Sequence, residues 1–92
     1  FVCNCDEAAY RAIRQLRGMG YNVPDDISIV GYDNYLISEV SDPTITTINV
    51  DADYMADLAV MTLMDRMEEP DGKPRIITIE GDLVIKDSVK RI

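Results

Sequence analysis

The sequence contains no histidine and no tryptophan, and cysteine occurs only twice in its 92 residues. Without histidine the chain lacks the side chain that most often serves as a general base near neutral pH and the commonest metal ligand in proteins. Its acidic residues form no carboxylate pair at a catalytic spacing, and its five glycines form no phosphate-binding loop. We therefore expect no catalytic residue, no metal site and no cofactor.

The two cysteines, Cys3 and Cys5, are separated by one residue in a short apolar run. In a strand their side chains would point to the same face, too close in sequence for an unstrained disulfide. Two thiols without histidine also make a poor zinc site. The spacing favours reduced thiols, as found in cytoplasmic proteins.

Long hydrophobic runs and excess positive charge are also missing. No stretch approaches the roughly 20 apolar residues of a membrane helix, and no signal peptide is visible, so we expect no membrane partner. Seventeen acids against nine bases give a net charge of −8. Such a surface repels phosphate backbones, so any DNA contact is expected from parts of a parent protein outside these residues.

What the sequence does have is a globular composition, with 47% hydrophobic residues. It opens at Phe1 inside an apolar run, without an initiator methionine. This opening predicts a downstream piece of a longer protein rather than a complete one.

The first third alternates strand and helix patterns. Residues 1–4 and 27–31 are rich in apolar and β-branched residues, and residues 6–19 carry apolar side chains at helical spacing. Gly18 and Gly20 are expected to end this helix. Strand, helix and strand within about thirty residues predict a βαβ unit with parallel strands, and hence an α/β fold.

The rest of the chain predicts a loop over 35–44, an extended segment over 45–50, and a helix from Asp51 or Asp53 to Met67. This helix is apolar around most of its circumference, which implies covering by missing parts of the protein or by a second subunit. Residues 75–79 and 83–85 are strand-like, and the short connection between them would also suit a hairpin.

One stretch is especially informative. A turn at Pro24 leads into the β-branched run of residues 27–30, and Gly31-Tyr32-Asp33-Asn34 follows. A buried strand that ends by presenting a carboxylate and an amide on a loop is how open α/β folds build polar ligand sites.

Three segments together carry a family resemblance: Phe1-Val2-Cys3-Asn4-Cys5-Asp6-Glu7, Gly20 to Asn34, and Pro43-Thr44-Ile45-Thr46-Thr47-Ile48. With the ending Leu83-Val84-Ile85-Lys86-Asp87-Ser88, they resemble the lac repressor/galactose repressor family of bacterial transcription regulators. The resemblance implies part of a periplasmic-binding-protein-like fold, in which two α/β subdomains with parallel sheets flanked by helices enclose a ligand.

The same resemblance implies a division of the chain. Residues 1–48 would lie in the C-terminal effector-binding subdomain, residues 49–80 in the N-terminal subdomain, and residues 81–92 would return to the C-terminal one. The chain would then be the last third of the effector-binding region. A crossing segment near residues 80–82 would replace the hairpin.

The resemblance also nominates ligand-binding residues. Asp33 matches the family position whose carboxylate accepts hydrogen bonds from effector hydroxyls, and Asn34 follows it. Cys5 stands where many members carry an effector-contacting asparagine, so a polar contact would be lost or moved. Asp6 is expected to be a helix N-cap or a cleft carboxylate, and Val50 an apolar contact near the crossing strand. For Asp33, a turn-forming role in an Asp-Asn pair is the alternative.

A homodimer is the other implied partnership. In relatives the first helix packs against its counterpart, which nominates Tyr10, Arg14 and Val40 as dimer contacts, although arginines at this spacing also suit a solvated face. Arg11 departs from the glycine usual in the family.

The predicted function is effector binding, with a sugar as the expected effector, and dimerisation within a DNA-binding transcription regulator whose helix-turn-helix lies outside this chain. A sugar-binding protein of a transporter shares the fold and is the nearest alternative. An α/β enzyme fragment is the third.

Overall fold

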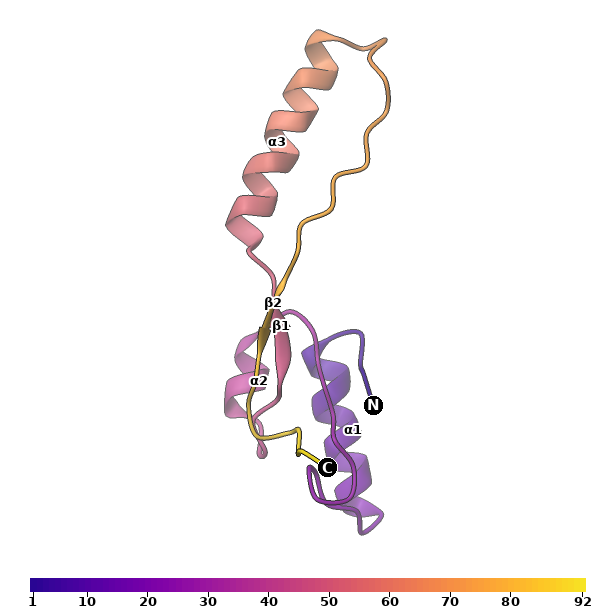
Figure 1. Cartoon of the computed structure of the whole chain (residues 1–92), viewed down its shortest axis with the longest axis vertical. Helices are drawn as coiled ribbons and strands as arrows, with labels where there is room; N and C mark the ends of the chain where they lie inside the picture. The colour runs from indigo at the N-terminus through magenta and orange to yellow at the C-terminus, as the bar shows by residue number, and fades with distance from the viewer. The chain divides into compact units, whose positions relative to one another are not determined.

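A computed structural model describes all 92 residues and contains three helices and two short strands in the order α1, α2, β1, α3, β2 (Figure 1). The chain divides into two compact units: residues 1–50 with 82–92, and residues 51–81. The divisions lie one or two residues from those expected at 48/49 and 80/81. The assignment of the segments to two subdomains stays a prediction.

The first helix, α1, spans Asp6–Gly18, as the spacing of its apolar residues predicts. Its buried face places Ala9 and Ile13 against Ile29 and Ile45, and these four residues form the hydrophobic core of the first unit. Gly20 follows with a φ of 91°, a left-handed conformation that glycine adopts without steric cost. The helix therefore ends where the sequence predicts.

Three extended segments of the first unit run parallel to one another. Val30 is paired with Val2 on one side and with Thr46 on the other, which confirms the predicted parallel pairing. These pairings are isolated bridges rather than continuous strands. The amide of Ile29 donates to the Ser88 carbonyl, that of Val30 to the Phe1 carbonyl, and that of Gly31 to the Thr46 carbonyl.

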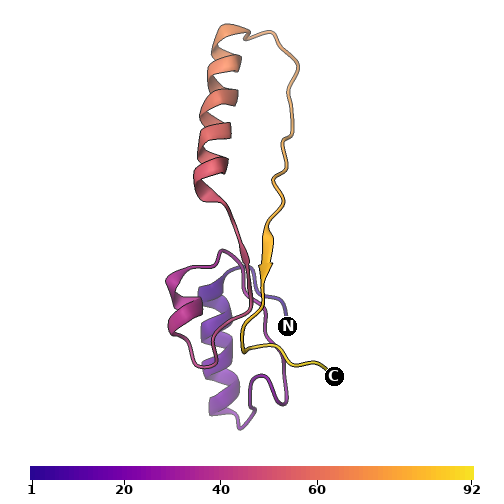
Figure 2. The same ribbon diagram turned by 60° about the vertical axis from the view of Figure 1, so that its left-hand side comes forward.

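The strands β1 (Thr47–Asn49) and β2 (Asp82–Val84) pair antiparallel, with Ile48 opposite Leu83. They lie side by side in both ribbon views (Figures 1 and 2). The hairpin between residues 75–79 and 83–85 is therefore wrong: β2 pairs with a segment more than thirty residues earlier, and residues 75–79 are extended without forming a strand.

The sequence prediction missed α2, which spans Leu36–Val40 inside the expected loop 35–44. Five residues are too few to show helical periodicity. The hydroxyl of the buried Ser38 donates to the carbonyl of Tyr35 at 2.7 Å, and no side chain caps the start of the helix.

The C-terminal segment returns across the first unit and is held by Ser88. This buried hydroxyl donates to the Ile29 carbonyl at 2.6 Å and accepts from the Thr46 amide at 2.8 Å. Thr46 also accepts from the Lys86 amide at 2.8 Å. These hydrogen bonds therefore hold residues 86–88 against the parallel segments and have a structural role.

The second unit contains α3, Ala52–Glu68, which confirms the predicted helix. Asp51 is its N-cap and accepts from the Tyr54 amide at 3.0 Å. No α3 residue is buried. Apolar side chains of α3 and of the extended segment line a groove of about 450 Å³, namely Met55, Leu58, Ala59, Leu63, Ile77 and Ile79.

No helix combines the length and the apolar character needed to cross a membrane.

Candidate functional site

The loop of residues 33–35 follows the central parallel segment and is fixed at every backbone amide. The amide of Asp33 donates to the Ile48 carbonyl at 3.0 Å, that of Asn34 to Thr47 Oγ1 at 3.2 Å, and that of Tyr35 to Asp6 Oδ2 at 2.8 Å. Asp33 and Asn34 have positive φ angles of 101° and 54°. Such conformations persist where surrounding bonds over-determine them, a condition typical of ligand loops.

The carboxylate of Asp6 holds this loop through a hydrogen bond from the Tyr35 amide. The side chain is completely buried; its Oδ1 accepts from Thr47 Oγ1 at 2.6 Å and its Oδ2 from the Tyr35 amide. The N-cap of α1 is Cys5, whose side chain makes no capping bond, so the N-cap interpretation of Asp6 is wrong. Asp6 lies one residue further on, at the positive end of the helix, and links α1 to the loop and to β1.

Gly31 makes this arrangement possible. It is buried beside Asp6, and a Cβ added at Gly31 would overlap Asp6 Oδ1 and lie 3.1 Å from Asp6 Cα. Any larger residue would displace the carboxylate that holds Tyr35 and Thr47.

The side chain of Asp33 has no hydrogen-bond partner, unlike that of Asn34. Its half-buried carboxylate makes no hydrogen bond or ion pair within the chain, and the only buried side-chain polar atom that lacks a partner is Ser41 Oγ. The Asp33 oxygens are therefore accessible to solvent. A carboxylate held on a rigid loop and left free can accept charge-assisted bonds from a ligand.

The side chain of Asn34, in contrast, makes a hydrogen bond through each of its two polar atoms. Its Oδ1 accepts from Lys86 Nζ at 3.1 Å, and its Nδ2 donates to Asn49 Oδ1 at 3.1 Å. Of the two loop residues nominated from the sequence, only Asp33 leaves its polar group free.

The sequence prediction missed the roles of Lys86 and Asn49. Lys86 has a side chain only 11% exposed, and its ammonium donates to Asn34, to Ser38 Oγ at 2.8 Å and to Glu39 Oε1 at 2.6 Å. Asn49 is paired with Asp33 on one side and with Asp82 on the other. One signal for Asn49 was available, because asparagine is unfavourable in a β-rich run such as residues 45–50.

Cys5 and Val50 are both half-buried in the first unit. Cys5 is a free thiol at the start of α1, as is Cys3 in the segment before it. Burial raises the pKa of the Cys3 thiol, so this group is protonated and unreactive near neutral pH. Neither Cys5 nor Val50 forms a side-chain hydrogen bond with the loop.

The nominated dimer residues lie on α1 and α2. Tyr10 and Arg14 stack, with the guanidinium carbon 5.8 Å from the ring centroid. With Leu36 and Ile37 they line an open groove of about 780 Å³ between the two helices. Val40 lies outside this groove and is 65% exposed at the end of α2, and Arg11 is paired with Glu7 at 2.7 Å.

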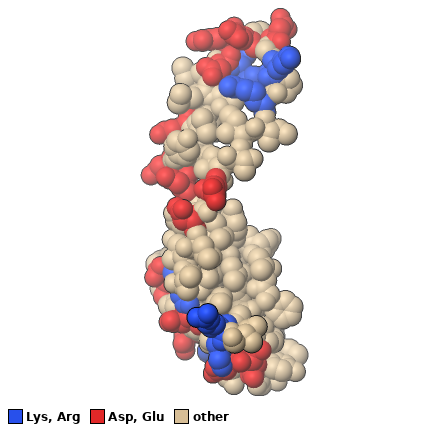
Figure 3. Space-filling model, in the orientation of Figure 1, with Lys and Arg blue, Asp and Glu red and all other residues tan.

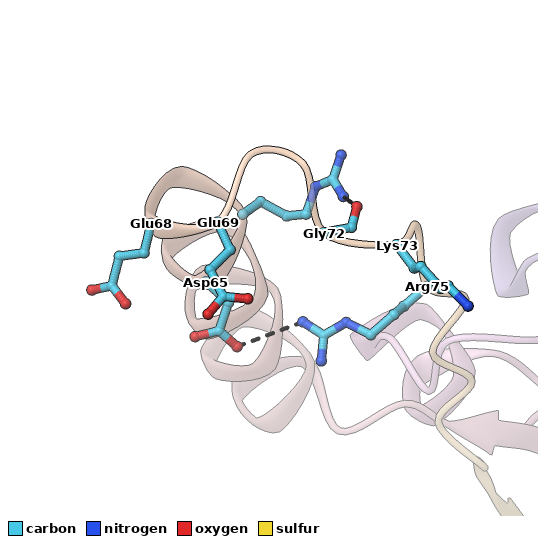
Figure 4. Close-up of a pocket in the computed structure, with 7 residues that line it drawn as sticks. Asp65, Glu68, Glu69, Gly72, Lys73 and Arg75 are labelled. Atoms are coloured by element: carbon cyan, nitrogen blue, oxygen red, sulfur yellow. Dashed lines mark hydrogen bonds and ion pairs between the residues drawn. The ribbon is translucent and has the colours of Figure 1, made fainter.

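A polar pocket lies at the end of α3 in the second unit (Figure 4). Figure 3 shows the basic side chains of this unit gathered there beside acidic ones. Arg75 pairs with Asp65 at 3.5 Å, and Arg66 donates to the Gly72 carbonyl at 2.7 Å. Both arginines therefore have partners within the chain, and the remaining charged residues of the pocket, Lys73, Glu68 and Glu69, are exposed at its surface. No cluster of three potential metal ligands occurs in the chain.

Comparison with known proteins decides the family. The profile of the periplasmic binding protein-like domain matches residues 1–89. The chain belongs to this family. It is 40% identical to the HTH-type transcriptional repressor PurR of Mannheimia succiniciproducens over 92 residues, which are the whole chain and 27% of that protein.

Solved structures give the same result. The chain is similar to a transcriptional regulator CelR–cellobiose complex, with a TM-score of 0.85 and 29% identity over 95% of this chain and 27% of that one. It is also similar to the lac repressor dimer bound to operator and the anti-inducer ONPF, with a TM-score of 0.83 and 26% identity over 96% and 30%.

These relatives confirm that the chain is similar to a segment of lac repressor-type regulators and has a periplasmic-binding-protein-like α/β fold. The PurR protein of Mannheimia succiniciproducens is a transcriptional repressor. The chain spans about a quarter of the length of the curated relatives that it matches.

Proposed function

We propose that this chain is part of the effector-binding region of a bacterial transcription regulator, and that Asp33 contacts the effector. The single observation that carries the proposal is the free Asp33 carboxylate on a loop whose three backbone amides are all bonded. A carboxylate can accept from two adjacent hydroxyl groups, so the proposed effector is a sugar. One of the similar regulators is a cellobiose complex, which agrees with this choice.

In this proposal the residues nominated from the sequence have unequal roles. Asp33 contacts the effector, while Asp6 and Asn34 hold the loop through their occupied polar groups. Cys5 and Val50 contribute packing surface on the same unit. Residues 51–81 belong to the second, N-terminal subdomain of the complete protein, and operator DNA binds through a domain outside this chain.

The test uses the intact regulator and a thermal-shift screen of sugars that includes glucose and cellobiose. Asp33→Ala should weaken the affinity for the bound sugar about 10- to 100-fold, the worth of a charge-assisted hydrogen bond, and leave operator binding of the effector-free protein unchanged. Asp42→Ala is the matched control, because its side chain is 93% exposed in the same unit. An unaltered sugar affinity in Asp33→Ala would remove this residue from the site.

We further propose that the face formed by α1 and α2 is the homodimer contact. Tyr10, Leu36 and Ile37 combine apolar surface with the Arg14 cation in one groove, and Val40 extends the exposed apolar surface of α2. Changing Tyr10 and Val40 together to glutamate should lower the sedimentation coefficient of the intact protein toward that of a monomer. Met19→Glu, at an exposed methionine just after α1, should leave it unchanged.

The transporter alternative is decided by the sequence upstream of this chain in the parent gene. A helix-turn-helix there supports the regulator, and a signal peptide would favour a secreted binding protein.

A further inference from the structure

A chain of hydrogen bonds runs from Lys86 in the C-terminal segment through Asn34 to Asn49 at the end of β1. Its donors and acceptors can be assigned in only one way. An ammonium can donate but cannot accept, so the atom of Asn34 that faces Lys86 must be the oxygen. The amide nitrogen of Asn34 therefore faces Asn49, and the atom of Asn49 that meets it must in turn be an oxygen. Lys86 thus fixes the orientation of two successive side-chain amides, because the oxygen and nitrogen of an amide are assigned from their hydrogen-bond partners.

Lys86 is itself held firmly. Its three ammonium hydrogens have three acceptors, on Asn34, Ser38 and Glu39, and its side chain is nearly buried. The Ser38 hydroxyl points its own hydrogen at the Tyr35 carbonyl, so it can accept from Lys86. The contacts of Lys86 with α2 therefore fix which atoms donate and which accept along this chain of hydrogen bonds.

This chain of hydrogen bonds leaves one donor unused at its end. Asn49 Nδ2 has no partner within the chain, and it is not among the buried unpartnered atoms, so it is open to solvent. Asn49 is the direct pairing partner of Asp33, and neighbouring segments lie about 4.8 Å apart. The free donor, Asn49 Nδ2, and the free acceptor, the Asp33 carboxylate, therefore belong to residues that are directly paired on adjacent segments.

We infer that Asn49 donates a hydrogen bond to the effector beside Asp33, and that Lys86 acts through Asn34 as the positioning residue that keeps the Asn49 amide in its donating orientation. The inference rests on the proposed effector role of Asp33. It requires a ligand that carries an acceptor next to a donor, either two neighbouring hydroxyls of a sugar or the carbonyl and N–H edge of a nucleobase.

Two isosteric variants of the intact regulator separate this inference from a packing role. Asn49→Asp keeps the oxygen that Asn34 needs, removes the free donor and adds a negative charge beside Asp33. Asn34→Asp keeps the bond to Lys86 but offers an oxygen to Asn49, which must then rotate its nitrogen inward and present its oxygen to the ligand. Each variant should weaken binding at least 10-fold. Asn22→Asp makes the same change at an exposed asparagine and should have no effect.

Binding is measured by calorimetry with glucose, cellobiose and guanine as probes. Tight binding of either sugar identifies the diol, and tight binding of guanine identifies the nucleobase edge. Loss of binding in Asp33→Ala together with wild-type affinity in both isosteric variants would overturn the role of Asn49 and leave the proposed function intact. If no probe binds the wild type, the proposal of a sugar effector is contradicted. The orientation of the Asn34 and Asn49 amides can then still be tested by the NMR measurement described below.

The orientation of the amides can be measured without ligand by NMR of asparagine side chains labelled with ¹⁵N. In the wild type, the Asn34 amide hydrogen that is bonded to Asn49 should be protected from solvent exchange, and both side-chain amide hydrogens of Asn49 should exchange rapidly. In Asn34→Asp, the Asn49 hydrogens should become protected. Lys86→Met should remove the wild-type protection of Asn34 and Lys86→Arg should restore it. Protected Asn49 hydrogens in the wild type would overturn the inference.

Discussion

At the scale of single residues, the loop at 33–35 depends on contacts that local sequence does not encode. The sequence identified Asp33 as a candidate because a carboxylate after a buried strand is recognisable. It misassigned Asp6, because its partners Tyr35 and Thr47 lie 29 and 41 positions away. Lys86 was visible only as a basic residue near the end of the chain, since its three acceptors are about fifty residues upstream.

The closest of these contacts gives a residue-scale prediction. Gly31→Ala should lower the free energy of unfolding by about 1–3 kcal/mol, because the new Cβ overlaps the buried Asp6 carboxylate and something must shift. Gly18→Ala is the control: a Cβ there meets nothing within 4 Å, and alanine at the end of α1 should leave stability unchanged or raise it slightly. Chemical denaturation of both variants measures the difference, and equal stabilities would contradict the proposed close packing.

At the scale of elements, periodicity predicted α1 and α3 well because both are long enough to repeat. It missed α2, which has five residues, and it predicted a strand at 75–79 that finds no pairing partner among the 92 residues. The pairing of β1 with β2 could not be derived from residue patterns, since both are three-residue strands far apart in the chain. Only the family resemblance argued against the hairpin.

The cap of α3 gives the element-scale prediction. Asp51 accepts from the Tyr54 amide at 3.0 Å, so Asp51→Ala should destabilise the first turn by about 0.5–2 kcal/mol. The expected signature is faster hydrogen exchange at the amide of Tyr54 and at its immediate neighbours, with α1 unaffected. Asp57→Ala, inside the same helix, removes an acid without removing a cap and should not accelerate exchange at Tyr54. Equal acceleration in the two variants would show that loss of charge, not of the cap, is responsible.

At the scale of the whole molecule, the four core residues all lie in the first unit, and none of the residues of α3 is buried. Exposed apolar side chains on one helix include Tyr54, Met55, Val60, Met61, Leu63, Met64 and Met67. Surface of this kind marks an interaction site. In the proposed function it is covered by the part of the N-terminal subdomain that this chain does not contain.

The 92-residue chain by itself should therefore associate through α3. We expect sedimentation velocity to show concentration-dependent association at about 10–100 µM, a range in which exposed apolar surface drives self-association. Changing Met61 and Met64 together to lysine should shift the chain toward monomer, because two charges cannot be desolvated in an apolar contact without a large cost. Met19→Lys makes the same exchange at a methionine that is 70% exposed in the first unit, and it should leave association unchanged. A chain that sediments as a monomer at every concentration would contradict the assignment of α3 to a buried position in the complete protein, and an equal effect of Met19→Lys would move the association surface to the first unit.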